Sequence, residues 1–217
     1  KQAMKYWKQM FKGNAIHRRI YLPLHSNGVR FDNESTLSVG FHLSQHVVNK
    51  MIKCAQATNV TMYELLLALN CIFVHKLSNC ETDLCIGSTT VQHPTKPIDI
   101  LPCRIHINPQ ESLSKIALQI KQLCLENMNH CCIPYEEIIK NIFDDQHQLC
   151  LSYIQVLFLY NELSNTEDVY SKHDSLSEQN IPRFDLLLSV NYDHIQEKVF
   201  GSLQCYLNQS EKQTLQR

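Results

Sequence analysis

Residues 60–91 constrain the fold of this chain more than any other segment, because a strongly marked helix start leads there into an apolar helix and then a strand. Thr61 and Glu64 have the spacing of a capping box, in which each side chain bonds a backbone N–H that the first helical turn leaves unpaired. The helix behind them is apolar on nearly all sides, which predicts burial in a core. Its apolar residues are Met62, Leu65, Leu66, Leu67, Ala68, Leu69, Cys71, Ile72, Phe73 and Val74. Residues 84–91 are rich enough in β-branched side chains to predict a strand, so the pattern indicates the α/β class.

Helical periodicity marks four further segments. Residues 2–12 carry large apolar side chains on one face. Ser44 is a candidate N-cap of a second helix, because its hydroxyl can bond an unpaired N–H of the first turn. The buried stripe expected behind it is Val47, Val48, Met51 and Ala55. Ser112 is the corresponding cap for residues 113–127, and Pro134 is expected at the first position of a short helix.

Alternating or continuously apolar segments predict the strands. They are residues 37–43, 84–91, 103–107, 153–160, 184–190 and 199–207. The fourth of these is apolar on both faces apart from Gln155, as expected of a central strand covered on each side. The last two are expected to pair as a hairpin through residues 193–197. Residues 161–182 are polar and show no periodicity, so we expect a flexible loop there.

Composition narrows the class of protein. A chain of 217 residues that is 44% hydrophobic can bury the core of one compact domain. Twenty basic against 21 acidic residues, with no long basic run, argue against a nucleic-acid partner. The longest apolar run, residues 65–74, is about half of the ~20 residues that a membrane span needs, so no membrane partner is expected. Most of the ten cysteines occupy apolar positions of predicted elements, which favours free thiols and a cytoplasmic location.

Short motifs follow one another along nearly the whole chain. They are residues 6–8 (YWK) with 22–23 (LP), 43–44 (LS), 60–61 (VT), 83–87 (DLCIG), 101–104 (LPCR), His130 with residues 134–136 (PYE), 154–158 (IQVLF) and 184–188 (FDLLL). Each motif is weak alone. Their order and spacing resemble the C-terminal half of a condensation domain of nonribosomal peptide synthetases, in the chloramphenicol-acetyltransferase-like superfamily. The motif residues expected to support the fold are Arg104, His130, Pro134, Glu136 and Asp185.

The resemblance implies a particular fold and chemistry. The fold would be a two-layer α/β sandwich, in which helices pack on a mixed β-sheet. Residues 1–217 would form the C-terminal lobe of a two-lobed domain whose N-terminal lobe is absent, and the start at Lys1 within a helical pattern fits a piece of a longer protein. Such domains transfer a thioester-bound acyl or peptidyl group to an amine, aided by a His of the motif His-His-x-x-x-Asp-Gly. None of the eleven histidines here is adjacent to another, so the other lobe would supply that base and no catalytic residue is expected in this chain.

The resemblance also implies partners. No cofactor would bind directly, and the phosphopantetheine arm of peptidyl or acyl carrier domains would tether the substrates next to an adenylation domain. The chain departs from the family at Asp99, where Asn is usual, at Cys131 and Cys132, which replace Gln-Asp, and at residues 146–150, which lack the usual Arg and Ser. Two alternatives therefore stay open: a non-catalytic module that docks carrier proteins, and an acyltransferase relative that uses coenzyme A.

Three residues are candidates for lining the substrate tunnel. Gln155 is a lone amide in an apolar strand, so it could hold a substrate carbonyl, or it could be a buried amide whose hydrogen bonds are satisfied by a neighbouring loop. His93 and Asp99 lie in the segment that follows the central helix–strand unit, and only the resemblance places them near the cleft.

Other polar residues favour structural roles. Arg104 and Asp185 are expected to pair across adjacent strands as a structural ion pair. His130 beside Cys131 and Cys132 suggests a metal or a nucleophile, but no Cys-x-x-Cys spacing supports it, and we expect no metal. Glu136 and its neighbour Glu137 point to different sides of a helix, which predicts a solvated face and not a carboxylate pair.

Overall fold

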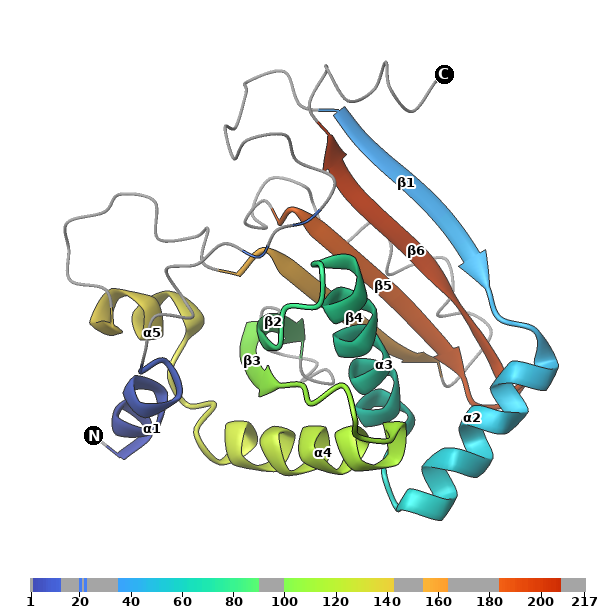
Figure 1. The fold of residues 1–217 in the computed structure, drawn as a ribbon, viewed down its shortest axis with the longest axis horizontal. Helices are drawn as coiled ribbons and strands as arrows, with labels where there is room; N and C mark the ends of the chain where they lie inside the picture. The colour runs from blue at the N-terminus through green and yellow to red at the C-terminus, as the bar shows by residue number, and fades with distance from the viewer. Residues whose placement is uncertain are drawn as a thin grey trace.

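The computed structural model describes residues 2–12, 20, 22, 35–89, 100–142, 154–163 and 184–207. The described chain contains both helices and strands, as the α/β class predicted from the sequence requires (Figure 1). The elements are α1 (Gln2–Met10), β1 (Ser35–His42), α2 (Gln45–Thr58), α3 (Met62–Leu77), β2 (Asp83–Thr89), β3 (Ile100–His106), α4 (Leu113–Asn129), α5 (Tyr135–Ile142), β4 (Val156–Leu163), β5 (Leu186–Asp193) and β6 (Lys198–Leu207).

The strands form one mixed sheet with the order β1-β6-β5-β4-β2-β3. The central strand β4 runs parallel to both of its neighbours, β2 and β5, whereas the other pairs are antiparallel. Residues 156–160 are all buried, which confirms that this segment is a central strand. β5 and β6 form the predicted hairpin, in which Leu186 lies opposite Cys205 and Asp193 opposite Lys198.

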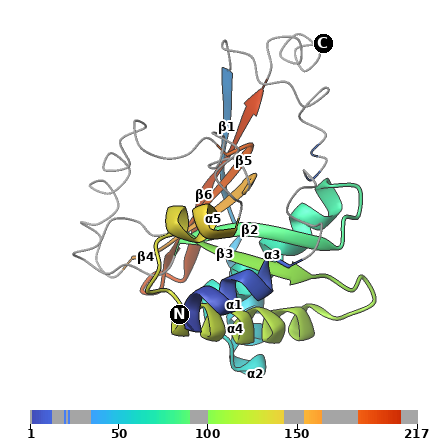
Figure 2. The ribbon, with the colours of Figure 1, turned by 90° about the vertical axis from the view of Figure 1, so that its left-hand side faces the viewer.

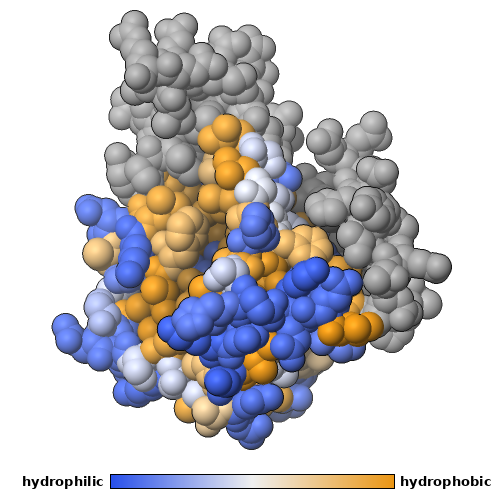
Figure 3. Space-filling model, turned by 90° about the vertical axis from the view of Figure 1, so that its right-hand side faces the viewer, coloured by the Kyte–Doolittle hydropathy of each residue, from blue (hydrophilic) through white to orange (hydrophobic). Residues whose placement is uncertain are grey.

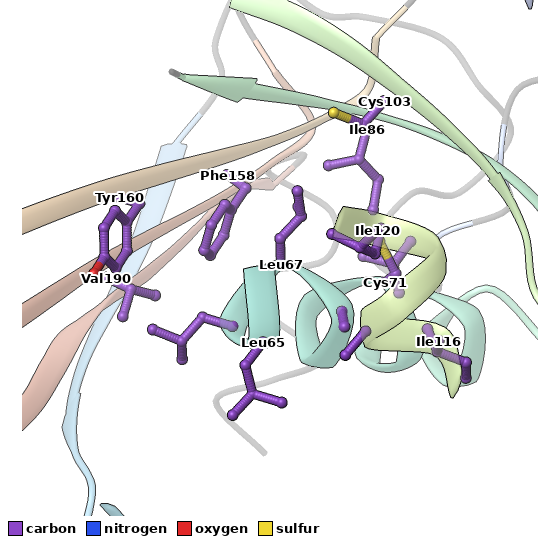
Figure 4. Close-up of a cluster of buried hydrophobic side chains, with 14 of the residues drawn as sticks. Leu65, Leu67, Cys71, Ile86, Cys103, Ile116, Ile120, Phe158, Tyr160 and Val190 are labelled. Carbon is purple, nitrogen blue, oxygen red and sulfur yellow. The ribbon is translucent and has the colours of Figure 1, made fainter. Parts of the chain in front are cut away.

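Helices α2, α3 and α4 pack on one face of the sheet (Figure 2). The capping box at the start of α3 is confirmed, because the Glu64 N–H donates to Thr61 Oγ1 and the Thr61 N–H donates to Glu64 Oε2. Figure 4 shows Leu67 and Cys71 of α3 among Phe158 of β4 and Ile120 of α4. All four of these side chains are fully buried, so α3 is the core helix that its sequence predicts.

The opposite face of the sheet contacts α5. Tyr135 and Ile139 of this helix pack with Leu157 and Leu159 of β4 and with Phe184. Alternate residues of β4 point to opposite faces, so Phe158 faces α3 while its neighbours face α5. The fold is thus an α/β sandwich in which the middle of the sheet is covered on both faces.

Several boundaries and faces differ from the sequence-based expectations. Val47 is 40% exposed and Phe73 is 39% exposed, because the elements packed around α2 and α3 do not reach those two positions. Helix α5 begins at Tyr135, and Pro134 precedes it as the residue whose carbonyl accepts the first helical bond, from Ile138. Residues 161–163 extend β4 and are not loop, because they continue its ladder with β5. The rest of the predicted loop, residues 164–182, lies outside the described residues.

In the described part of the chain, no single helix is long and apolar enough to span a membrane; only α2 and α3 taken together reach that length and composition, and they are bent by 108° at the break between them.

Candidate functional site

The hairpin of β2 and β3 carries an ion pair at the edge of the sheet. Arg104 lies opposite Cys85 in the ladder, which brings its side chain beside that of Asp83. Its Nε donates to Asp83 Oδ1 at 2.9 Å and its Nη2 donates to Oδ2 at 2.7 Å, so the pair is bidentate. The hydrogen bond from Arg104 is the main reason why the pKa of Asp83 is lowered, and it holds the carboxyl ionised.

The predicted pairing of Arg104 with Asp185 is wrong. β3 and β5 are not adjacent, because β2 and β4 lie between them in the sheet. Asp83 takes the place of the expected partner, and Asp185 instead accepts a hydrogen bond from Gln155. Arg104 and Asp185 therefore belong to two separate clusters of contacts.

Arg104 also fixes the end of α1. Its Nη1 donates to the carbonyl oxygens of Met10 at 2.7 Å and Lys12 at 3.0 Å. The Met10 carbonyl ends α1 and the Lys12 carbonyl follows the helix, so neither has a further intrahelical donor. One guanidinium group thus joins the N-terminal helix to the edge of the sheet.

A second set of contacts holds the other side of α1. Trp7 is fully buried, and its Nε1 donates to the carbonyl oxygen of His130 at 3.1 Å. The Tyr6 hydroxyl donates to Asn127 Oδ1 at 2.7 Å, and Asn127 Nδ2 donates to the carbonyl oxygen of Pro102 at 3.0 Å. The Tyr6 and Trp7 pair of the first motif therefore locks α1 onto the C-terminal end of α4.

His130 ends α4 and lies against Tyr6, with 4.2 Å between the ring centroids. The neighbouring Cys131 is half-buried and Cys132 is exposed. Among the described residues, no group of three or more His, Cys, Asp or Glu side chains is arranged to hold a metal ion. Glu136 is exposed on α5 beside Glu137, which confirms the solvated face.

These contacts surround a groove between α1, α4 and the edge strand β3. Its volume is about 560 Å³, and its lining combines apolar and charged side chains. The lining residues are Tyr6, Gln9, Met10, Asp83, Arg104, His106, Leu123 and Glu126. Burial is the largest cause of the raised pKa of Tyr6, and the charge of Glu126 adds to it. The phenol therefore stays protonated at neutral pH and serves as a hydrogen-bond donor.

Gln155 directly precedes β4, and both the nitrogen and the oxygen of its amide form hydrogen bonds. Its Nε2 donates to Asp185 Oδ2 at 2.7 Å and to the carbonyl oxygen of Ile20 at 3.3 Å, while its Oε1 accepts from the Ile20 N–H. The amide thus binds the backbone of Ile20 as a neighbouring strand would. These bonds fit the alternative of a buried amide satisfied by a loop. The role of Gln155 in a substrate tunnel stays a prediction.

The other two tunnel candidates, His93 and Asp99, lie outside the described residues.

Several cysteines gather in the core and are poorly reactive. Burial raises the pKa of Cys85 and of Cys124 to about 12, and it raises the pKa of Cys71 and Cys103 further. A thiol with such a pKa is protonated at neutral pH and does not act as a nucleophile. These four residues therefore behave as small apolar side chains, as predicted for Cys71, Cys103 and Cys124 from their apolar positions in the sequence.

Sequence reasoning missed the contacts that organise this region. Asp83 stands in the DLCIG motif and Arg104 in the LPCR motif, so pairing these two segments as one antiparallel hairpin would have brought the two charges together. The polar Asn127 in the otherwise apolar stripe of α4 was a second signal, because a buried amide needs partners.

The mixed sheet, with three helices on one face and α5 on the other, defines an α/β fold. The Condensation domain family matches residues 1–198, and the chain belongs to this family. Members of this family act on substrates bound to phosphopantetheinylated carriers.

Three comparisons illustrate the relationship. Tyrocidine synthase 2 of Brevibacillus parabrevis is 23% identical in an alignment 202 residues long, which covers 86% of this chain and 5% of that protein. The X-domain from teicoplanin biosynthesis has a TM-score of 0.75 at 15% identity, over 96% of this chain and 50% of that chain. The condensation domain from the Monacolin K polyketide synthase MokA has a TM-score of 0.68 at 14% identity, over 94% of this chain and 51% of that chain. The chain therefore spans about half the length of these two solved structures and a small part of Tyrocidine synthase 2.

Proposed function

We propose that residues 1–217 form the C-terminal lobe of a condensation domain that joins a thioester-bound acyl or peptidyl group to an amine. The observation that carries the proposal is the family match over residues 1–198, together with solved relatives that are about twice as long as this chain. Half of a two-lobed domain would give this result. The substrates would be tethered to peptidyl or acyl carrier domains, beside an adenylation domain of the same synthetase.

In this proposal the lobe positions the two substrates and shapes the cleft in which they react. The amine of the acceptor attacks the thioester carbon, a C–N bond forms, and the carrier thiol leaves with the proton that the amine gives up. The other lobe supplies the His that orients or deprotonates the amine. A rigid wall aligns the two substrates and excludes water, which would otherwise hydrolyse the thioester. We propose Gln155, His93 and Asp99 as residues of that wall.

The contacts of α1 support a structural role for this region. Arg104, Asn127 and the buried Trp7 fix α1 against the sheet and α4, so the segment that enters this lobe is held in one place. A fixed entry would keep the orientation of a preceding lobe constant. This lobe would thereby set the width of the substrate cleft.

Amide formation is the direct test. The full-length protein is assayed by mass spectrometry with a carrier-bound thioester donor and a carrier-bound amine acceptor, and the 217-residue chain is assayed beside it. We expect product from the full-length protein and none from the chain alone. Replacement of the second His of a His-His-x-x-x-Asp-Gly motif in the other lobe should abolish product. Turnover by the chain alone would contradict the proposal.

A second function, docking of carrier proteins without catalysis, is favoured by one feature of this chain. Cys131 and Cys132 stand where the family usually has Gln and Asp, directly after His130 at the end of α4. Binding of a carrier to the full-length protein with no amide product would support this function. Conversely, a Cys131→Gln, Cys132→Asp variant that gains activity would indicate a weakened enzyme and not a docking module.

A further inference from the structure

Among the residues that the structure describes, no strand pairs with the outer side of β1, which we call the open edge of the sheet. It pairs with β6 over all eight residues of Ser35–His42, and it ends the strand order on that side (Figure 1). Its sequence, STLSVGFH, contains no Lys, Arg, Asp, Glu or Pro, and its ladder with β6 continues without a bulge. Edge strands usually carry a charged residue, a proline or a bulge, because an edge without one of them pairs readily with another strand.

The backbone of β1 offers a regular row of hydrogen-bonding groups on its outer side. Leu43 donates its N–H to the carbonyl oxygen of Val199, which fixes the alternation of the ladder beside β6. In an antiparallel pair, alternate residues direct both backbone groups to the same side. The N–H and C=O groups of Thr36, Ser38, Gly40 and His42 therefore point away from β6, toward the open edge.

The side chains of β1 add an apolar row. Leu37 is 43% exposed and Val39 is 54% exposed, and both lie on the sheet face that packs against α3, since Val39 is opposite Leu203 and Leu203 is opposite Leu188. Phe41 lies on the same face and packs against the core. Figure 3 views the side of the molecule on which β1 and α2 lie, and it shows apolar side chains at that surface. The apolar face of the sheet therefore continues to its edge and is left partly open there.

We propose that β1 pairs with β1 of a second copy of this chain, in antiparallel orientation about a two-fold axis next to Val39. The outward backbone groups must meet each other, so Ser38 lies opposite Gly40 of the second copy and Thr36 opposite His42. In this register Val39 faces Val39 of the second copy, and Leu37 faces Phe41. The two sheets become one, and their apolar faces join.

The features of β1 favour a second copy over an unrelated strand. The apolar residues 37, 39 and 41 are symmetric about Val39, so the strand is complementary to itself in the antiparallel direction. A neutral edge adds no repulsion when it meets its own copy, whereas a lysine on it would oppose the same lysine. An isologous contact of this kind closes after two copies and does not propagate into a fibre.

The test measures association of the 217-residue chain by analytical ultracentrifugation over a range of concentrations. Val39→Lys places two like charges opposite each other, and we expect the dimer dissociation constant to rise by at least about tenfold. Ser38→Pro removes an outward N–H without touching the bonds to β6, and an edge strand tolerates proline at such a position. We expect the same weakening from this variant even if Val39→Lys disturbs the fold.

Ile195→Lys is the matched control, because Ile195 is 63% exposed in the turn between β5 and β6 and lies away from the open edge. The control should leave the dimer unchanged, and circular dichroism should show the same secondary structure in every variant. A wild-type chain that stays monomeric over a 100-fold increase in its concentration would overturn the proposal. A dimer that both Val39→Lys and Ser38→Pro leave intact would overturn it as well. The outcome does not depend on the proposed enzymatic function.

Discussion

At the scale of single residues, Arg104 joins three elements, because its side chain on β3 contacts β2 and the end of α1 at once. Arg104→Lys keeps the charge but cannot make the bidentate pair and both carbonyl contacts. We expect the free energy of unfolding to fall by about 2 kcal/mol at pH 7. Urea denaturation followed by circular dichroism measures this change.

The surface pair of Lys115 and Glu111 is the matched control for that variant. Its charged atoms lie 2.7 Å apart, but the Lys115 side chain is 63% exposed. Lys115→Ala should therefore lower the free energy of unfolding by less than about 0.5 kcal/mol. Equal losses in the two variants would mean that the groove contacts of Arg104 contribute no more than an exposed ion pair.

The stability that Asp83 provides should depend on pH. The hydrogen bond from Arg104 lowers the pKa of Asp83 in the folded protein, so its stabilisation is present above the unfolded pKa of about 3.9 and is lost as the pH falls through the folded pKa. The gap in unfolding free energy between wild type and Asp83→Asn should be largest near pH 6 and should narrow below about pH 3.5. Denaturation curves across this range measure it, and a gap that widens on acidification would contradict the assignment.

At the scale of elements, β6 depends on one glycine. A Cβ on Gly201 would lie 2.0 Å from the carbonyl oxygen of Ser189 on β5, so the two strands could not keep their spacing. Gly201→Ala should lower the free energy of unfolding by about 2 kcal/mol or more. Gly40 on β1 is the matched control, because its nearest atom would be 3.9 Å away and its substitution should change stability by less than about 1 kcal/mol. Thermal unfolding of both variants distinguishes a steric clash specific to position 201 from the general effect of replacing a strand glycine by alanine.

Elements defined by local patterns could be predicted from the sequence, because their determinants are close together in the chain. The capping box of Thr61 and Glu64, the helical stripe behind it and the β5–β6 hairpin depend on short-range spacing and are confirmed. The partner of Arg104 depends on which strands are neighbours, and the periodicity of a single segment does not give that. The expected pair with Asp185 fails because β2 and β4 come between β3 and β5.

Exposure at the ends of a helix was equally hard to predict. Val47 and Phe73 continue apolar stripes, yet both are more than a third exposed, since periodicity gives the face of a helix but not how far its neighbours extend. Gln155 was singled out correctly as an unusual amide in an apolar strand. Its partner Ile20 lies 135 residues away in the chain, and only the three-dimensional arrangement reveals it.

At the scale of the whole molecule, the proposed two-lobed domain predicts that a second lobe stabilises this one. A partner that binds only the folded chain adds about 2.7 kcal/mol when its free concentration is 100 times its dissociation constant. For a domain of this size, such a gain raises the unfolding temperature by roughly 5–10 °C. We expect this rise when the lobe that completes the domain in the full-length protein is added to the 217-residue chain, as measured by differential scanning calorimetry.

Self-association through β1 would also raise the unfolding temperature, so the two effects must be separated. The Ser38→Pro variant removes an outward donor of β1 and should lose only the part of the stabilisation that depends on chain concentration. If the added lobe stabilises this variant as much as wild type, the lobe contact lies elsewhere than the open edge. No rise in either protein, at lobe concentrations far above those of the chain, would contradict the two-lobed assignment. A rise in wild type alone would instead place the second lobe on β1, in competition with the second copy of the chain.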